Sequence, residues 1–154
     1  MDPRSFAIEA HGSQRYGERP YVYHLDQVAE LVASVDPRPE LRVLAYLHDV
    51  LEDTSVSQAD LTGHFGAAVA RSVEALSKRK DEPVAAYVAR IAEAGDDAVL
   101  VKVADRLANM RSSAADRPKL LERYRQEMPV FRGALHRNAH ALLWSELDAL
   151  TVEP

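Results

Sequence analysis

The stretch LHDVLEDT, residues 47 to 54, places an imidazole and three carboxylates directly after the apolar run VLAYL. A helix over this stretch would bring four ionisable side chains within about one turn of each other: His48, Asp49, Glu52 and Asp53. Like charges this close repel one another and are costly beside apolar residues unless a positive group lies among them. The stretch therefore predicts a divalent cation site, and the alternative is a solvated acidic helix end.

Outward from this stretch, apolar residues recur at steps of three and four, which predicts helices and no strand. The GERP segment, residues 17–20, is expected to form a loop, and Ser57 with Asp60 resembles a capping box. The expected helices cover about residues 5–16, 25–35, 40–52, 58–64, 67–78, 83–94 and 98–110, with one or two more between 118 and 150. The pattern predicts an all-α chain forming a single compact domain over residues 1–154.

Composition narrows the classes of function. The chain has 154 residues, 47% of them hydrophobic, and a net charge of −5 without any long basic block, which disfavours a nucleic-acid partner. We find no apolar run of about 18 residues and no signal-like N-terminus, so we expect no membrane partner and a cytoplasmic location. Because the chain contains no cysteine, any metal must be held by histidine and carboxylate.

Two further segments carry unusual polar residues. In VLVKVADRLANMR, residues 99–111, Asp105 follows a mostly apolar run and Asn109 lies one turn later. A lone buried Asp is more often the partner of an arginine or a helix cap than a ligand. In PYVYHLDQVAELV, residues 20–32, His24 opens an amphipathic segment, where a single histidine is most often a core or capping residue. Each segment is evidence for a metal ligand only when it is considered together with LHDVLEDT.

The order His24, then His48-Asp49, then Asp105 resembles the HD superfamily of metal-dependent phosphohydrolases. The resemblance is closest to the hydrolase domain of RelA/SpoT alarmone enzymes and to the small alarmone hydrolases. It is carried by HGSQRYGERPYVYH (residues 11–24), LHDVLEDT (47–54), the FG of HFGAAVARSVEALSK (64–78) and VKVADRLANMR (101–111). These motifs span about residues 6–112 and are specific through their order and spacing. The fold that the resemblance implies is a single HD-domain helical bundle, with C-terminal helices over about residues 118–150.

The resemblance implies that His24, His48, Asp49 and Asp105 bind one metal ion, usually Mn²⁺ in this family. Two imidazoles and two carboxylates make a mixed nitrogen and oxygen site, which also suits Fe²⁺ or Zn²⁺. The same resemblance assigns Glu52 and Asp53 to activating or orienting the attacking water, with either one as the base. Both are therefore expected to be catalytic.

Residues expected to bind the substrate follow from the same resemblance. Asn109 matches a residue that contacts the sugar, and Arg15 matches an arginine that lies against the nucleobase, where a planar guanidinium can stack. Tyr16 stands where the family often has a basic residue that helps to bind phosphate. Two more candidates are Lys78, which could equally complement a helix dipole, and Tyr124, in a loosely aligned region.

The implied activity is removal of pyrophosphate from the 3′ position of the guanosine alarmone (p)ppGpp. One alternative is hydrolysis of another nucleotide, such as ppApp or NADPH, and a second is a nucleotide-binding module without turnover. The small-molecule nucleotide is the only partner expected, and the sequence leaves the oligomeric state open. Because the chain ends soon after these motifs, we expect a hydrolase without a synthetase domain.

Overall fold

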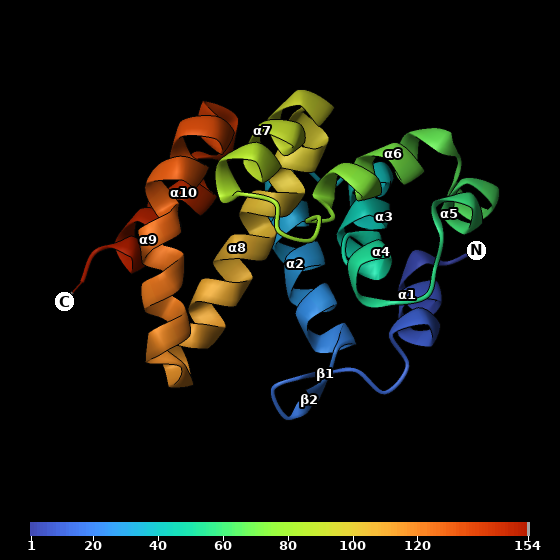
Figure 1. Ribbon diagram of the computed structural model, residues 1–154, viewed down its shortest axis with the longest axis horizontal. Coiled ribbons are helices and arrows are strands. Elements are labelled where there is room, and N and C mark those ends of the chain that lie inside the picture. The colour runs from blue at the N-terminus through green and yellow to red at the C-terminus, as the bar shows by residue number, and fades with distance from the viewer. Residues whose placement is uncertain (154) are drawn as a thin grey trace.

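The computed structural model describes residues 1–153 as a bundle of helices with one short hairpin (Figure 1). The elements from the N-terminus to the middle of the chain are α1 (Pro3–His11), β1 (Arg15–Tyr16), β2 (Arg19–Pro20), α2 (Val22–Val35), α3 (Pro39–Leu47), α4 (Val50–Asp53), α5 (Gln58–Phe65) and α6 (Ala67–Leu76). They are followed by α7 (Val84–Ala94), α8 (Asp96–Asp116), α9 (Pro118–Leu135), the 3₁₀ turn η1 (Asn138–His140) and α10 (Ala141–Thr151).

Helix α8 is the central element of the bundle. It is the longest helix, with 21 residues, and it contacts α2, α3, α6, α7, α9 and α10. Figure 1 shows it between α9 and α10 on one side and α2 on the other. Fully buried side chains lie along it, including Val99, Leu107 and Met110. Because α8 is surrounded on several sides, its apolar residues pack one continuous core, which confirms the expected single compact helical domain.

The N-terminal segment differs from the expectation in two ways. The helix expected to run to Tyr16 ends at His11, where Gly12 adopts a φ of 55° and donates its backbone N–H to the carbonyl of Ile8. A left-handed φ of this kind is accessible to glycine and stops a helix. The expectation of no strand was also wrong, because β1 and β2 pair as a two-residue antiparallel hairpin whose turn contains Gly17 at a φ of 61°.

The helix expected over residues 40–52 is interrupted at His48 and Asp49. Helix α3 ends at Leu47, α4 begins at Val50, and Asp49 between them has a φ of −105° and a ψ of −2°. The carbonyl of Ala45 is bound by the His48 imidazole at 2.7 Å, so a side chain replaces part of the helical hydrogen bonding. The break separates His48 and Asp49 from the turn that carries Glu52 and Asp53.

Other boundaries lie closer to the expectation. Ser57 and Asp60 form a reciprocal capping box at the start of α5, as the sequence predicted. Helix α8 extends beyond the expected residues 98–110 at both ends: it begins at Asp96, directly after Gly95 at a φ of 116°, and ends at Asp116. Among residues 1–153, no helix is both long enough and apolar enough to cross a membrane.

Candidate metal centre

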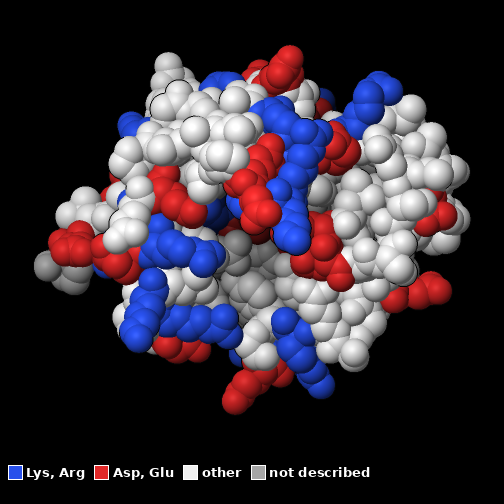
Figure 2. Space-filling model, in the orientation of Figure 1, with Lys and Arg blue, Asp and Glu red and all other residues white. Residues whose placement is uncertain are grey.

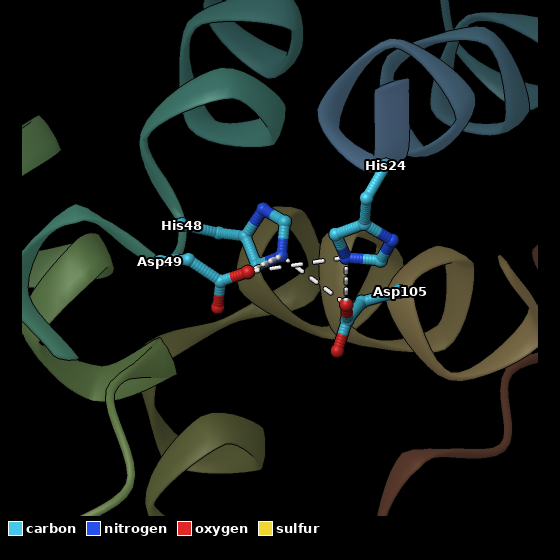
Figure 3. Close-up of side chains that lie close together, drawn as sticks. All are labelled: His24, His48, Asp49 and Asp105. Carbon is cyan, nitrogen blue, oxygen red and sulfur yellow. Dashed lines mark hydrogen bonds and ion pairs between the residues drawn. The ribbon is translucent and has the colours of Figure 1, made fainter. Parts of the chain in front are cut away.

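The side chains of His24, His48, Asp49 and Asp105 point toward one another in the interior of the bundle (Figure 3). One ligand atom from each of them lies within 4.8 Å of the others. They come from three separate parts of the chain: the first turn of α2, the junction between α3 and α4, and the middle of α8. The fold therefore assembles the set of donors that the motif order predicted.

The distances within this cluster are short. Asp105 Oδ1 lies 2.9 Å from His24 Nε2 and 3.2 Å from His48 Nε2. Asp49 Oδ2 lies 3.1 Å from His48 Nε2 and 3.8 Å from His24 Nε2. The two Nε2 atoms and two carboxylate oxygens thus enclose one small volume, in which a single cation can contact all four.

The hydrogen bonding of His48 fits a metal ion at this volume. Its Nδ1–H donates to the backbone carbonyl of Ala45, so in the neutral ring the lone pair on Nε2 faces the carboxylates of Asp49 and Asp105. A lone pair and two anionic oxygens repel unless a proton or a cation lies between them. His24 Nδ1 is buried without a hydrogen-bond partner among residues 1–153, so Nε2 is the nitrogen that this ring directs at the cluster.

The electrostatic balance shows how strongly the cluster attracts positive charge. Burial opposes the charged form of His48, but the carboxylates of Asp49 and Asp105 outweigh it and raise its pKa well above the usual value. Burial alone would raise the pKa of Asp49, yet the nearby imidazolium of His48 lowers it to about 2. A divalent cation would take the place of this proton and neutralise both carboxylates.

Lys102 supplies a second positive charge to the cluster. Its Nζ donates to Asp105 Oδ2 at 2.8 Å, one turn away on α8, and its side chain is 13% exposed. Burial opposes the lysine charge, but attraction to Asp105 prevails and raises its pKa. The two oxygens of Asp105 thus have separate partners, since Oδ1 faces the imidazoles and Oδ2 faces the ammonium.

We expect Lys102→Met to destabilise the metal-free protein by about 3–5 kcal/mol, because it leaves a buried carboxylate without its ammonium partner. Urea unfolding in the presence of a chelator measures this change. The control is Lys80→Met, which removes an exposed lysine in the loop between α6 and α7. An equal effect of the two substitutions would mean that the Lys102–Asp105 pair contributes no net stability.

Two tyrosines complete the surroundings of the metal ligands. Tyr21 donates its hydroxyl to Asp49 Oδ2 at 2.6 Å. Tyr16 stacks on the His24 ring, with centroids 4.6 Å apart and planes 16° apart, and donates its hydroxyl to Asn109 Oδ1 at 2.7 Å. Burial raises the pKa of Tyr16 to about 12, so its hydroxyl is a neutral donor near neutral pH. The tyrosines restrict the orientation of Asp49 and His24.

A cavity of about 600 Å³ opens over the cluster, a size typical of small-molecule sites. Its lining includes the ligands Asp49 and Asp105 and four basic side chains: Lys78, Lys102, Arg106 and Arg123. In Figure 2, acidic and basic side chains gather around a hollow near the middle of the face. The lining also contains the carboxylates of Glu52, Asp53 and Glu127, so acidic and basic groups face the same space, where a metal ion and a phosphorylated ligand could both bind.

The remaining candidate residues divide into two groups. Six of them line the cavity: Tyr16, Glu52, Asp53, Lys78, Asn109 and Tyr124. Glu52 accepts the backbone N–H of Lys78 at 2.7 Å, and partial burial raises its pKa. Arg15 is exposed on β1 and does not line this cavity, so its place against a nucleobase stays a prediction.

Sequence reasoning missed two side chains that touch the acidic residues of the site. One is Tyr21, which binds Asp49, and the other is Gln14, whose Nε2 donates to Asp53 Oδ2 at 3.1 Å. A signal for Tyr21 existed, because it precedes His24 by three residues and such residues share a helix face. Gln14 lies in a loop, where no periodicity predicts the direction of a side chain.

Comparison with known protein families matches residues 4–132 to the HD domain. A curated relative from Vibrio cholerae, named guanosine-3′,5′-bis(diphosphate) 3′-pyrophosphohydrolase, is 33% identical over 96% of this chain and 23% of its own length. A relative from Danio rerio, guanosine-3′,5′-bis(diphosphate) 3′-pyrophosphohydrolase MESH1, is 34% identical over 72% of this chain and 67% of its own length. The chain spans about a quarter of the length of the first of these relatives.

Solved structures also match. A metazoan orthologue of SpoT, described as hydrolysing ppGpp with a role in starvation responses, superposes with a TM-score of 0.82 at 27% identity, over 96% of this chain and 90% of that one. A protein of Listeria monocytogenes superposes with a TM-score of 0.69 at 22% identity, over 89% of this chain and 100% of that one. At that identity the second match concerns the fold alone.

Proposed function

From the premise that this chain belongs to the HD-domain family and is related to the SpoT/RelA hydrolase domains and MESH1, we propose that it is a metal-dependent (p)ppGpp 3′-pyrophosphohydrolase. The observation that carries the proposal is the convergence of two imidazoles and two carboxylates beside a cavity that is lined by both acidic and basic side chains. Two relatives, which match 96% and 72% of the chain, are named for this reaction.

The residues of the cluster would hold the ion through His24 Nε2, His48 Nε2 and one oxygen each of Asp49 and Asp105, and we propose Mn²⁺ as that ion. When bound, a divalent cation supplies charge that polarises phosphoryl oxygens and acidifies water at the site. The tyrosine hydroxyl on Asp49 and the ammonium on Asp105 hold these ligands in place.

Glu52 and Asp53 would handle the proton of the attacking water. In the hydrolysis, a water oxygen forms a bond to the phosphorus that is attached to the ribose 3′ oxygen, and the bond between that phosphorus and the ribose 3′ oxygen breaks. One proton of the water must then be passed to the departing 3′ oxygen. Both carboxylates line the cavity and neither is a member of the metal cluster, so both are free to accept that proton. The backbone N–H of Lys78 orients Glu52.

The cavity walls would hold the nucleotide. Lys78 and Arg123 offer cationic groups for the diphosphate, and their charges offset the charge that develops on its oxygens during the reaction. Arg106 is buried and already donates to Glu127 Oε1 at 3.0 Å. Asn109 would bind the ribose, with its amide oriented by Tyr16 and by Asp105, whose Oδ1 accepts its Nδ2–H at 3.2 Å. Tyr124 lines the same wall, and Arg15 is proposed to reach the base from β1.

Tyr16 favours keeping another nucleotide as an alternative substrate of the same phosphohydrolase. It places an uncharged phenol in the lining of the cavity, on the ring of a metal ligand, where it offers a stacking face but no cation. A site of this kind would also accommodate ppApp, or NADPH hydrolysed at its phosphate. A binding module without turnover is disfavoured because the ligand set and the Glu52–Asp53 pair are all present.

The test is to incubate the Mn²⁺-loaded protein separately with ppGpp, ppApp and NADPH and to measure pyrophosphate and phosphate release. We expect pyrophosphate and GDP from ppGpp at the highest kcat/KM. If phosphate were released from NADPH and neither alarmone were hydrolysed, NADPH would replace ppGpp as the proposed substrate. If the protein bound the metal but hydrolysed none of the three nucleotides, it would be a binding module. The same incubations after dialysis against a chelator should show no release.

A further inference from the structure

His11, a buried histidine outside the metal cluster, is linked by one route to the catalytic carboxylate of Asp53 and by another to Asp49 of the metal cluster. It is the last residue of α1 and is 7% exposed. Its Nδ1 lies 2.8 Å from Gln14 Oε1, and Gln14 Nε2 donates to Asp53 Oδ2 at 3.1 Å. We propose that His11 and Gln14 are positioning residues that hold the Asp53 carboxylate in its orientation for catalysis. The proposal rests on the proposed function.

The direction of these hydrogen bonds follows from the chemistry of the groups. An ionised carboxylate can only accept, so Gln14 must turn its NH₂ toward Asp53 and its carbonyl oxygen toward His11. That oxygen needs a donor, which requires the proton of the imidazole to be on Nδ1. The tautomer of a buried ring therefore determines which end of the amide faces Asp53.

The second route passes through an aromatic contact. The His11 ring packs against Tyr21, with centroids 4.6 Å apart and planes 33° apart, and the Tyr21 hydroxyl donates to Asp49. The backbone links the same residues, since Gln14 N–H donates to the His11 carbonyl and Tyr21 N–H donates to the Gln14 carbonyl. One buried imidazole thus supports the orientation of Asp49 through packing and that of Asp53 through hydrogen bonds.

The position of Asp53 in the fold does not by itself restrict the orientation of its carboxylate. It is exposed and is the last residue of α4, a helix of only four residues. An exposed aspartate samples several rotamers, and a small misplacement of a catalytic group can lower the rate considerably. The partly buried Gln14, anchored on a buried ring, selects one orientation of this carboxylate.

The first measurement is steady-state hydrolysis of ppGpp by Mn²⁺-loaded His11→Phe, which keeps a ring but removes the donor, and by Gln14→Leu. We expect kcat to fall about 10- to 100-fold in each, as for other partners of active-site groups, with KM and Mn²⁺ affinity within about threefold of the unaltered protein. His11→Asn, which can place an amide donor near the position of Nδ1, should recover most of the loss.

Coupling separates positioning from a general loss of stability. If His11 acts through Gln14 on Asp53, the double variant His11→Phe/Gln14→Leu should be no slower than Gln14→Leu alone. Likewise, Gln14→Leu should have no further effect in an Asp53→Asn background. The matched control is His140→Phe, the same change at a buried histidine in η1, for which we expect an unchanged kcat.

Unchanged kcat in folded His11→Phe and Gln14→Leu, or losses that simply add, would overturn the proposal. An independent readout is the long-range ¹H–¹⁵N NMR correlation of His11 in the unaltered protein, where we expect the Nδ1–H tautomer. The Nε2–H tautomer would also overturn it, whatever the activity. Because this readout needs no turnover, a failure of the proposed function itself, seen as no ppGpp hydrolysis by the unaltered protein, is distinguished from a failure of this inference.

Discussion

Asp49→Ala is expected to abolish Mn²⁺ binding and to lower kcat/KM for ppGpp at least about a thousandfold. The substitution removes one of two carboxylates from a cluster whose donors lie within 4.8 Å of one another. It also leaves the Tyr21 hydroxyl without its acceptor. A metal centre contributes several kcal/mol to a phosphoryl-transfer transition state, and about 4 kcal/mol corresponds to three orders of magnitude in rate.

Isothermal titration with MnCl₂ measures the binding loss directly, and the nucleotide assay measures the rate. The control is Asp148→Ala, which removes a half-buried aspartate on α10 that pairs with Arg132. Circular dichroism establishes that both variants are folded. Retention of stoichiometric Mn²⁺ binding by folded Asp49→Ala would contradict the ligand assignment, and full activity of the unaltered protein without metal would contradict the proposed chemistry.

The double variant Glu52→Gln/Asp53→Asn is expected to lower kcat about 10²- to 10⁴-fold while it retains Mn²⁺. Amides of the same shape keep the cavity lining but cannot accept the proton of the attacking water. Neither residue belongs to the metal cluster, so the titrated Mn²⁺ affinity should change only a few fold. Single-turnover rates measured with saturating ppGpp isolate the chemical step.

The single variants then divide the effect between the two carboxylates. Glu52→Gln weakens the hydrogen bond from the Lys78 backbone, whereas Asp53→Asn disturbs the contact with Gln14. Lys78→Met is a useful comparison with Glu52→Gln, because it removes the Lys78 ammonium from the cavity and leaves the hydrogen bond from the Lys78 backbone N–H to Glu52 intact. If the double variant kept more than about a tenth of the original kcat, another group would have to carry the proton.

The sequence predicted the members of the site better than their surroundings. His24, His48-Asp49 and Asp105 stand in the order of the motifs that resemble the HD superfamily, and the structure brings them together. The helical class followed from apolar periodicity, and the start of α5 followed from the capping box of Ser57 and Asp60. The helical class and the capping box are encoded by neighbouring residues, so they can be inferred without knowledge of the packing, whereas the ligand set followed from the order of the motifs.

The break at His48 and Asp49 could not be inferred in the same way. Periodicity continues through residues 40–52, and only the contact of the His48 ring with the Ala45 carbonyl, together with the conformation of Asp49, ends α3 there. The hairpin of β1 and β2 was missed for a related reason, because a strand of two residues is too short to show an alternation of apolar and polar residues.

The sequence by itself determined the helical class and the types of metal ligand, whereas the catalytic role that it predicted for Glu52 and Asp53 stays a prediction. Only the tertiary structure decided which residues support them: Tyr16 binds Asn109 across 93 positions of the chain, and Gln14 binds Asp53 across 39. Local patterns specify which face of a helix is apolar, but they carry no information on which distant side chain meets that face. That depends on how the elements pack, because a hydrogen bond requires two groups to lie within about 3 Å of each other.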